Sequence, residues 1–431
     1  MGSSDEVAGI AVPLLIVASV LAYAITARRL ERVGITAAMV FVAIGVVLGE
    51  SGTAIVPVDP DAPWLLSVAE ITLALLLFSD AARLRLREVG GDPRPVGRLL
   101  FIGLPLTVVA GTLLAFAVFP SSGWAVAALI AALLAPTDAA LGAAVVSDVR
   151  VPARVRRLLN VESGLNDGLA TPVVTVLIAV VAAQAGLLGD ESWEVRALWS
   201  LTIGVLVGVV VGGGGGVVLR SCRRRGWTSP LSEQVAALAL ALLSYLGATA
   251  VVANGFVAAF VGGMVMAAAL GSEEAGADLE YTETSGLLAS YVVWLAFGAA
   301  MVGPALSRAT IGTVLIAVGA LTVVRMVPVA IAMVGRGWSI PTIAFVGWFG
   351  PRGLATVIFA LIALESLGAS ALSDHLLDIA AVTVLASILV HGFSAGPLAA
   401  RYGRWAAGRS ATSPELVEVA PAPRRRLDLH S

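Results

Sequence analysis

Two carboxylates and an amide lie inside an apolar run of this chain, within the octapeptide VESGLNDG at residues 161–168. A carboxylate near the centre of a bilayer costs at least roughly 2.5 kcal/mol on insertion scales, so such groups usually face a protein interior or a water-filled cavity and mark ion or proton pathways. On a helix, residues four apart share a face, which places Ser163 with Asp167 and Glu162 with Asn166. One helix can therefore present Asp167 to a cavity and Glu162 to a neighbouring cation.

The chain is too apolar for a soluble domain. Hydrophobic residues make up 58% of it and charged residues 13%, whereas about 25% charged is typical of soluble domains. We therefore expect a polytopic membrane protein. Its single cysteine, Cys222, leaves no disulfide framework, so the fold depends on helix packing. Because Asp5 and Glu6 precede the first apolar run and no basic leader does, this run is predicted to be a retained helix.

Apolar runs of about 20 residues, the length that spans a bilayer, recur along the chain. They predict about thirteen transmembrane helices, near residues 9–27, 33–49, 64–80, 98–119, 123–147, 157–186, 198–219, 232–250, 252–270, 285–303, 309–334, 341–366 and 374–399. Arginines gather in alternate loops, which the positive-inside rule makes cytoplasmic. The predicted topology has the N-terminus outside and the C-terminus in the cytoplasm, in the cell membrane.

The predicted spans divide into two repeats of six helices, at about 9–186 and 232–399, joined by a Gly-rich linker helix at 198–219. A linker that crosses once inverts the second repeat relative to the first, as in many secondary transporters. The predicted transmembrane domain covers residues 1–402. Residues 403–431 are predicted to be a disordered cytoplasmic tail, because they contain few apolar residues and several prolines.

Three further stretches place polar groups at membrane depth. Pro136, followed by Thr137 and Asp138, interrupts a span and frees backbone carbonyls to bind a cation or water. Arg352 lies between helix-breaking residues in the segment Gly350–Gly353 and needs a buried partner, for which Glu162 is the candidate. Glu70 is a lone acid in the third span. Asp80, two residues beyond the apolar stretch that ends at Phe78, is interpreted as interfacial.

Taken together, these stretches resemble the signature of the monovalent cation:proton antiporters of the CPA1 branch, the NhaP/NHE-type exchangers. The resemblance rests on three motifs and covers roughly residues 9–400. They are Pro136-Thr137-Asp138, Glu162-Ser163-Gly164-Leu165-Asn166-Asp167 and Gly350-Pro351-Arg352-Gly353. It implies an all-α polytopic antiporter fold of the NhaA/NhaP type and a homodimer in the lipid bilayer. It implies no cofactor, no nucleic-acid partner and no enzymatic activity.

The resemblance also assigns roles to residues. Asp167 corresponds to the acid that carries the ion and the proton, with Asn166 beside it, and Glu162 corresponds to the acid that forms a structural ion pair with Arg352. Thr137 and Asp138 fall on the family's unwound helix. The monovalent cation is expected to be bound by Asp167, Ser163, Thr137 and Glu70. One departure from the family's pattern is Ala139, which stands at this helix break where many relatives have proline.

The expected mechanism is competition for one carboxylate. Desolvation disfavours a bare charge on Asp167, so the site is expected to cross the membrane with either a proton or a cation bound. Because the neighbour is Asn166 and not a second acid, one charge is exchanged per cycle and the exchange is predicted to be electroneutral. Sodium or lithium is the expected cation, and potassium is the alternative.

The sequence disfavours two other functions and gives structural roles to several other polar residues. An intramembrane hydrolase is disfavoured because the three histidines all lie beyond residue 370 and no His-Glu-x-x-His motif occurs. A channel is disfavoured because the ionisable groups cluster in a few helices. Arg325 is interpreted as a buried structural partner or a side chain that reaches the interface, and His391 as structural in preference to a pH sensor. The glycine run at 212–216 is interpreted as a close helix contact.

Overall fold

All regular structure in the described part of the chain is helical. The structure, a computed structural model, describes residues 2–56, 58–83, 93–188, 192–271, 278–410 and 412–416. Within these ranges the long helices are α1 (Gly2–Arg32), α3 (Pro63–Ala82), α4 (Arg94–Arg98) continuing into α5 (Leu104–Val118), α8 (Ala153–Gln184), α9 (Trp193–Gly208) continuing into α10 (Gly214–Arg224), α11 (Pro230–Ala250), α14 (Glu280–Phe297) continuing into α15 (Gly303–Arg308), α16 (Ile311–Leu321) followed by α17 (Val323–Met333), and α20 (Ala371–Ala407). The shorter helices are α2 (Ala37–Leu48), α6 (Gly123–Leu133), α7 (Ala143–Val146), α12 (Gly255–Leu270), α18 (Ile340–Trp348) and α19 (Leu354–Leu367).

The helices agree with a multi-pass membrane protein. In the described residues, nine helical runs are long and apolar enough to cross a membrane, and four further apolar helices have 10–17 residues. Each range predicted from the sequence contains helix. The exact number of thirteen spans and the inverted relation of two repeats stay predictions. Two predicted spans, 123–147 and 341–366, are not continuous, and their interruptions shape the centre of the molecule.

Helix starts are marked by side chains that accept hydrogen bonds from the first turn. Thr36, Asn254 and Ser339 each cap the following helix in this way, and Ser229 and Ser370 form reciprocal capping boxes. These caps supply partners for backbone N–H groups that have no carbonyl within the helix. These helices therefore begin directly after a polar residue that precedes an apolar run.

Glycines every fourth residue bring α9 and α10 against α12. A Cβ atom added at Gly204 would lie 2.7 Å from the carbonyl oxygen of Asn254, and one at Gly208 would lie 2.6 Å from that of Ala258. Gly212 faces the backbone of Gly262 just as closely. Such contact distances leave no room for side chains, as in other membrane helix pairs built on small residues. The interpretation of the glycine run as a close helix contact is confirmed.

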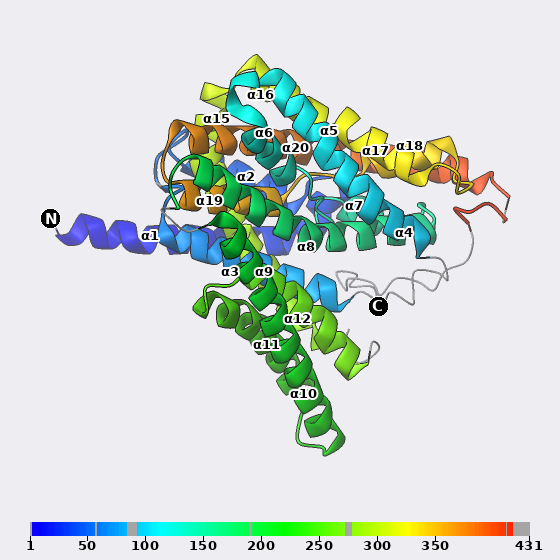
Figure 1. The fold of residues 1–431 in the computed structure, drawn as a ribbon, viewed down its shortest axis with the longest axis horizontal. Helices are drawn as coiled ribbons and strands as arrows, with labels where there is room; N and C mark the ends of the chain where they lie inside the picture. Colours follow the sequence, from blue (N-terminus) through cyan, green and yellow to red (C-terminus); the bar gives the residue numbers. More distant parts are fainter. Residues whose placement is uncertain are drawn as a thin grey trace.

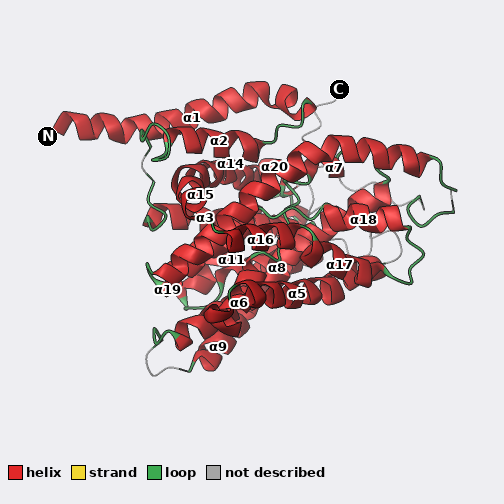
Figure 2. Ribbon diagram, turned by 90° about the horizontal axis from the view of Figure 1, so that it is seen from above, coloured by secondary structure: helices red, strands yellow, loops and turns green. Residues whose placement is uncertain are grey.

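Helix α8 is surrounded by other helices, and α1 lies at the periphery (Figure 1). Figure 1 shows α1 leaving the bundle at one end, while α9 to α12 extend away from the rest on one side. Figure 2 shows α1 and α9 on opposite sides. Helix α3 packs against α12 and α14, and α8 packs against α3, α6 and α19. The acidic motif on α8 therefore lies in the protein interior.

The region predicted to be a disordered tail is partly ordered. Helix α20 continues to Ala407, past the predicted boundary at residue 402. Beyond it, Glu415 is 1% exposed and its Oε1 accepts hydrogen bonds from Ser339 N and Thr342 Oγ1, both at 2.9 Å. Arg154 donates to the carbonyl of Pro414 at 2.7 Å. Glu415 thus holds residues 412–416 against the start of α18. Composition alone cannot indicate this contact. Residues 417–431 of the predicted tail lie outside the described residues.

Candidate functional site

Two interrupted helices cross in the interior. The first interruption separates α6, which ends at Leu133, from α7, and the second separates α18 from α19, which begins at Leu354. Asp138 N donates to the carbonyl of Pro351 at 2.8 Å, and Asp138 Oδ2 accepts from Leu354 N at 2.9 Å. The Asp138 side chain thus caps α19, where the helix dipole favours a negative charge. Residues 349–353 are therefore the break of the second half that meets Thr137 and Asp138.

The crossing requires glycine at position 353. A Cβ atom added to Gly353 would overlap the carboxylate of Asp138, lying only 2.6 Å from its Cγ. Prolines 136 and 351 have no backbone N–H to contribute to a helix. In this motif Pro351 interrupts the helix, and Gly353 leaves space for the Asp138 carboxylate that caps α19.

Asn166 and Ser163 of α8 hold the first unwound segment. Asn166 Oδ1 accepts from Thr137 N at 3.1 Å, and Asn166 Nδ2 donates to Thr137 Oγ1 at 2.5 Å. The Thr137 hydroxyl also lies 3.0 Å from Ser163 Oγ. Since Asn166 is fully buried, its amide replaces the helical partner that Thr137 lost at the break. Three of the predicted site residues are therefore brought together, with Asn166 serving to hold the backbone.

Asp167 lies one turn from Ser163 and is partly exposed. Its Oδ1 is buried and has no hydrogen-bond partner in the described part of the chain. The charged groups that act on it are the carboxylates of Asp138, Asp80 and Glu162 and the guanidinium of Arg352. A buried oxygen without a donor is costly. A proton or a bound cation would remove that cost.

The third helix contributes Asp80, not Glu70. A Cβ atom at Gly164 would lie 3.4 Å from Asp80 Cβ, so Asp80 packs against α8 one turn before Asp167. Glu70 is ten residues earlier on α3, which corresponds to about 15 Å along a helix, and its side chain hydrogen bonds Tyr245. The structure does not bring Glu70 to Asp167 but places Asp80 against α8, a contact that the sequence did not indicate. The missed signal is that Ala81 and Ala82 continue the apolar run beyond Asp80.

The partner of Glu162 is Arg325, not Arg352. Two parallel hydrogen bonds of 2.8 Å join the guanidinium of Arg325, on α17, to the carboxylate. The two side chains are 3% and 2% exposed. The predicted Glu162–Arg352 ion pair was therefore wrong, while the interpretation of Arg325 as a buried structural partner is confirmed. A sequence with two intramembrane arginines cannot show which of them reaches α8.

Arg352 is held by backbone carbonyls. Its Nη1 donates to Ala135 O at 2.7 Å and to Pro136 O at 3.2 Å, and its Nη2 contacts Ala320 O at 3.4 Å. Ala135 and Pro136 belong to the unwound segment, so their carbonyls lack helical partners. Arg352 thus binds the first break from within the second and places a positive charge near Asp167.

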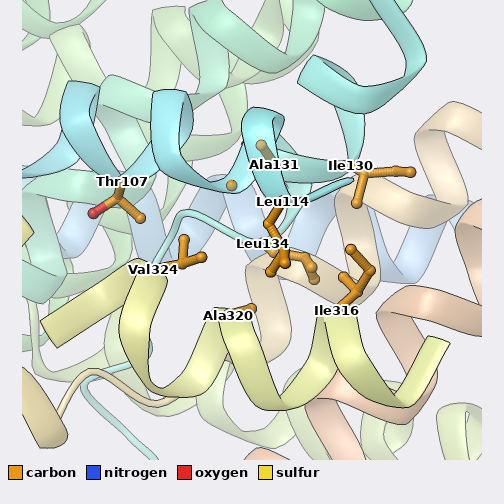
Figure 3. Close-up of a pocket in the computed structure, with 9 residues that line it drawn as sticks. Thr107, Leu114, Ile130, Ala131, Leu134, Ile316, Ala320 and Val324 are labelled. Carbon is orange, nitrogen blue, oxygen red and sulfur yellow. The ribbon is translucent and has the colours of Figure 1, made fainter. Parts of the chain in front are cut away.

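An apolar pocket lies beside this crossing. Figure 3 shows it between α5 and α6 on one side and α16 and α17 on the other, lined by residues that include Ile130, Leu134, Ile316 and Val324. The one polar residue of the lining is Thr107, whose hydroxyl donates to the carbonyl of Gly103. Nothing in this lining binds a cation. The groups that can do so are Asp167, Asp80, Ser163 and Thr137.

Two discontinuous helices that meet beside a partly buried carboxylate define a class, the polytopic membrane proteins built like secondary transporters. Comparison with known proteins identifies the family. Residues 16–401 match the family model for the transmembrane region of sodium/hydrogen exchangers, and the chain belongs to this family. The expected likeness to NhaP/NHE-type antiporters is confirmed.

Relatives and a solved structure agree with this family. The K(+)/H(+) antiporter NhaP of Alkalimonas amylolytica is 26% identical over 87% of this chain and 63% of its own length. The Na(+)/H(+) antiporter NhaP of Pseudomonas aeruginosa is 26% identical over 76% of this chain and 79% of its own. The sodium proton antiporter MjNhaP1 of Methanocaldococcus jannaschii superposes with a TM-score of 0.73 at 19% identity, covering 92% of this chain and 99% of that one. The chain spans under two thirds of the first two curated relatives, at 63% and 65% of their lengths.

Proposed function

We propose that this chain is a secondary antiporter that exchanges sodium or lithium for protons across the cell membrane, with both ions competing for Asp167. The observation that carries the proposal is the buried Oδ1 of Asp167, which has no donor among the described residues. A proton bound there, or a monovalent cation shared with Ser163 and Thr137, satisfies this oxygen. Either ligand neutralises the charge of the Asp167 carboxylate. With either one bound, the site can open alternately to the two sides of the membrane.

The arrangement favours electroneutral exchange of one cation for one proton. Asp138 is engaged by backbone N–H groups, since its Oδ1 accepts from Ala140 N at 2.7 Å and its Oδ2 from Leu354 N at 2.9 Å. Asp138 therefore serves as a fixed charge at the end of α19. Asn166 carries no charge. Asp80 adds negative potential that favours a cation at Asp167 over an empty site.

Potassium is the alternative cation. Two relatives support different choices, because one is named a K(+)/H(+) antiporter and the other a Na(+)/H(+) antiporter. The proposed ligands are a carboxylate and two hydroxyl groups, which bind any of the three alkali cations. The cation is therefore an outcome of the experiment below.

The proposed orientation puts the C-terminal end of α20 in the cytoplasm and the N-terminus outside. Supporting contacts join several arginine-bearing helix ends: Arg154, near the start of α8, reaches Pro414 after α20, and Arg98 donates to Ala332 O near the end of α17 at 2.5 Å. Arginine-rich ends gathered on one side are expected to be cytoplasmic. We further propose a homodimer in the lipid bilayer.

The test is transport by the purified full-length chain in proteoliposomes, with the internal pH followed after sodium, lithium or potassium is added in turn. In vesicles with the wild-type protein, entry of the added cation in exchange for protons is expected to raise the internal pH. Asp167→Asn is expected to abolish this exchange while the protein remains folded. Asp61→Asn, which changes an exposed loop acid, is the control and should exchange normally. Imposed membrane potentials of either sign should leave the wild-type rate unchanged. Exchange that persists in Asp167→Asn would disprove the assignment.

A further inference from the structure

The second unwound segment is bordered by a side-chain bridge from α20. Ser387, His391 and Ser394 have the spacing of one helix face, and all three contact α18 or residues 349–353. Ser387 Oγ accepts from Arg352 N at 2.7 Å, His391 Nε2 lies 2.9 Å from Trp348 O, and Ser394 Oγ accepts from the Trp348 indole at 3.0 Å. These contacts lie on the α20 side of the segment, away from the Asp138 cap.

When the imidazole is neutral, both ring nitrogens of His391 have a partner in only one proton arrangement of this bridge. Ser387 Oγ and His391 Nδ1 are 3.2 Å apart. If the serine hydroxyl donates to Nδ1, then Nε2 carries the proton and donates to Trp348 O. The hydrogen bonds then run in one direction, from the Arg352 N–H through Ser387 and His391 to the Trp348 carbonyl. This arrangement uses a neutral imidazole.

The bridge is buried and lies near two positive charges. Ser387 is fully buried and His391 is 2% exposed. The charged groups that act on the ring are the guanidinium groups of Arg352 and Arg325, and both repel an imidazolium. The other contact of Nδ1, 3.0 Å from Ser387 O, would need a proton on Nδ1. Nε2 would then face Trp348 O without a proton unless the ring were charged.

We infer that Ser387 and His391 are positioning residues for cation exchange, because their bridge fixes both ends of the unwound segment 349–353 against the ion site. The inference rests on the proposed function. The segment carries Arg352, which binds the carbonyls of Ala135 and Pro136, and its end is capped by Asp138. Fixing Trp348 and Arg352 relative to α20 thus fixes the charges around Asp167 without touching the cation.

The inference predicts a specific change in transport. His391→Leu keeps most of the ring's volume and removes both hydrogen bonds, so it is expected to raise the KM for the transported cation about fivefold to tenfold, the equivalent of losing about one buried hydrogen bond, with a smaller change in kcat. His391→Gln can still donate to Trp348 O and is expected to restore KM to within about twofold. His375→Leu is the control. It lies on α20 against the edge of Phe119, outside the bridge, and should leave KM unchanged.

Hydrogen exchange gives a readout that does not depend on transport. Ser387→Ala removes the acceptor of the Arg352 amide, so that amide should exchange about tenfold faster. The Leu354 amide, which Asp138 holds, should keep its wild-type rate. If the wild-type protein transports no cation but shows this pattern of amide hydrogen exchange, the proposed function is overturned, while the bridge between Ser387, His391 and Trp348 is supported. Unchanged KM in His391→Leu, or unchanged exchange at Arg352 in Ser387→Ala, would overturn the inference.

A merely structural role makes a different prediction. If Ser387 and His391 only stabilised the fold, their variants would lower the yield and the melting temperature, and the surviving protein would have a normal KM. The double variant separates the two possibilities further. Members of one bridge should not be additive, so Ser387→Ala with His391→Leu should raise KM no more than the larger single effect. Additive increases would show that the two side chains act independently.

Discussion

The Glu162–Arg325 ion pair provides the sharpest test of how this interior is held together. Replacing Arg325 with methionine leaves the Glu162 carboxylate, which is 2% exposed, without its cation. Two unit charges about 4 Å apart interact by about 4 kcal/mol at an effective dielectric constant of 20. Loss of one partner of a buried pair typically costs about 3 to 5 kcal/mol. We therefore expect Arg325→Met to destabilise the protein by about 4 kcal/mol.

The assay is thermal denaturation of the detergent-solubilised full-length chain, followed by the amount of monodisperse protein after heating. For a chain of 431 residues, the usual size scaling converts about 4 kcal/mol to a fall in Tm of roughly 4 °C. The matched control is Arg150→Met. Arg150 binds Asp148, with its Nη2 2.6 Å from Oδ2, but its side chain is 55% exposed and that of Asp148 is 13% exposed. Solvent screens this pair, so its loss should lower the Tm far less than the loss of Arg325.

Second-site variants identify the partner. Glu162→Gln combined with Arg325→Met removes both charges and should recover most of the lost Tm, because no buried charge is stranded. Glu162→Gln should not rescue Arg352→Met, since Arg352 is bound by carbonyl oxygens. Rescue of Arg352→Met, or equal losses in Arg325→Met and Arg150→Met, would refute the reasoning.

Three further predictions concern the crossing of the two interrupted helices and the segment that follows α20. Gly353→Ala should abolish exchange because its Cβ would overlap the cap of α19, whereas Gly396→Ala, which has open space around it, should transport normally in the same vesicles. Asp80→Asn should raise the KM for the cation several-fold without abolishing turnover, since it removes negative potential near Asp167; an unchanged KM would contradict a role at the site. Burial alone would raise the pKa of Glu415, but the hydrogen bonds it accepts outweigh burial and lower that pKa. Its folded-state pKa lies below the unfolded value, so Glu415 adds stability above about pH 4 and loses it as the pH falls further. Glu415→Gln should therefore melt lower than wild type at pH 7, the difference should shrink in acid, and a difference independent of pH would count against this.

The sequence by itself determined the class of fold and the position of its centre. Apolar runs of about 20 residues have the length of spanning helices, in which every backbone group is paired within the segment. Proline at 136 and at 351 marks where those helices are interrupted. Asp167 could be selected because it is a charge at membrane depth, and Ser163 because it is one turn away. These inferences use periodicity and composition, which are properties of a single segment.

Tertiary structure decided which distant groups meet. The sequence offered two arginines to Glu162 and two acids on the third helix. In the folded protein Arg325 and Asp80 contact α8, because the side chains of α17 and of the C-terminal end of α3 reach that helix. The fold also placed Glu415 at the start of α18, where composition had predicted a disordered tail. Such choices depend on the packing of helices far apart in the chain, and this packing sets distances of a few ångströms that no local pattern encodes.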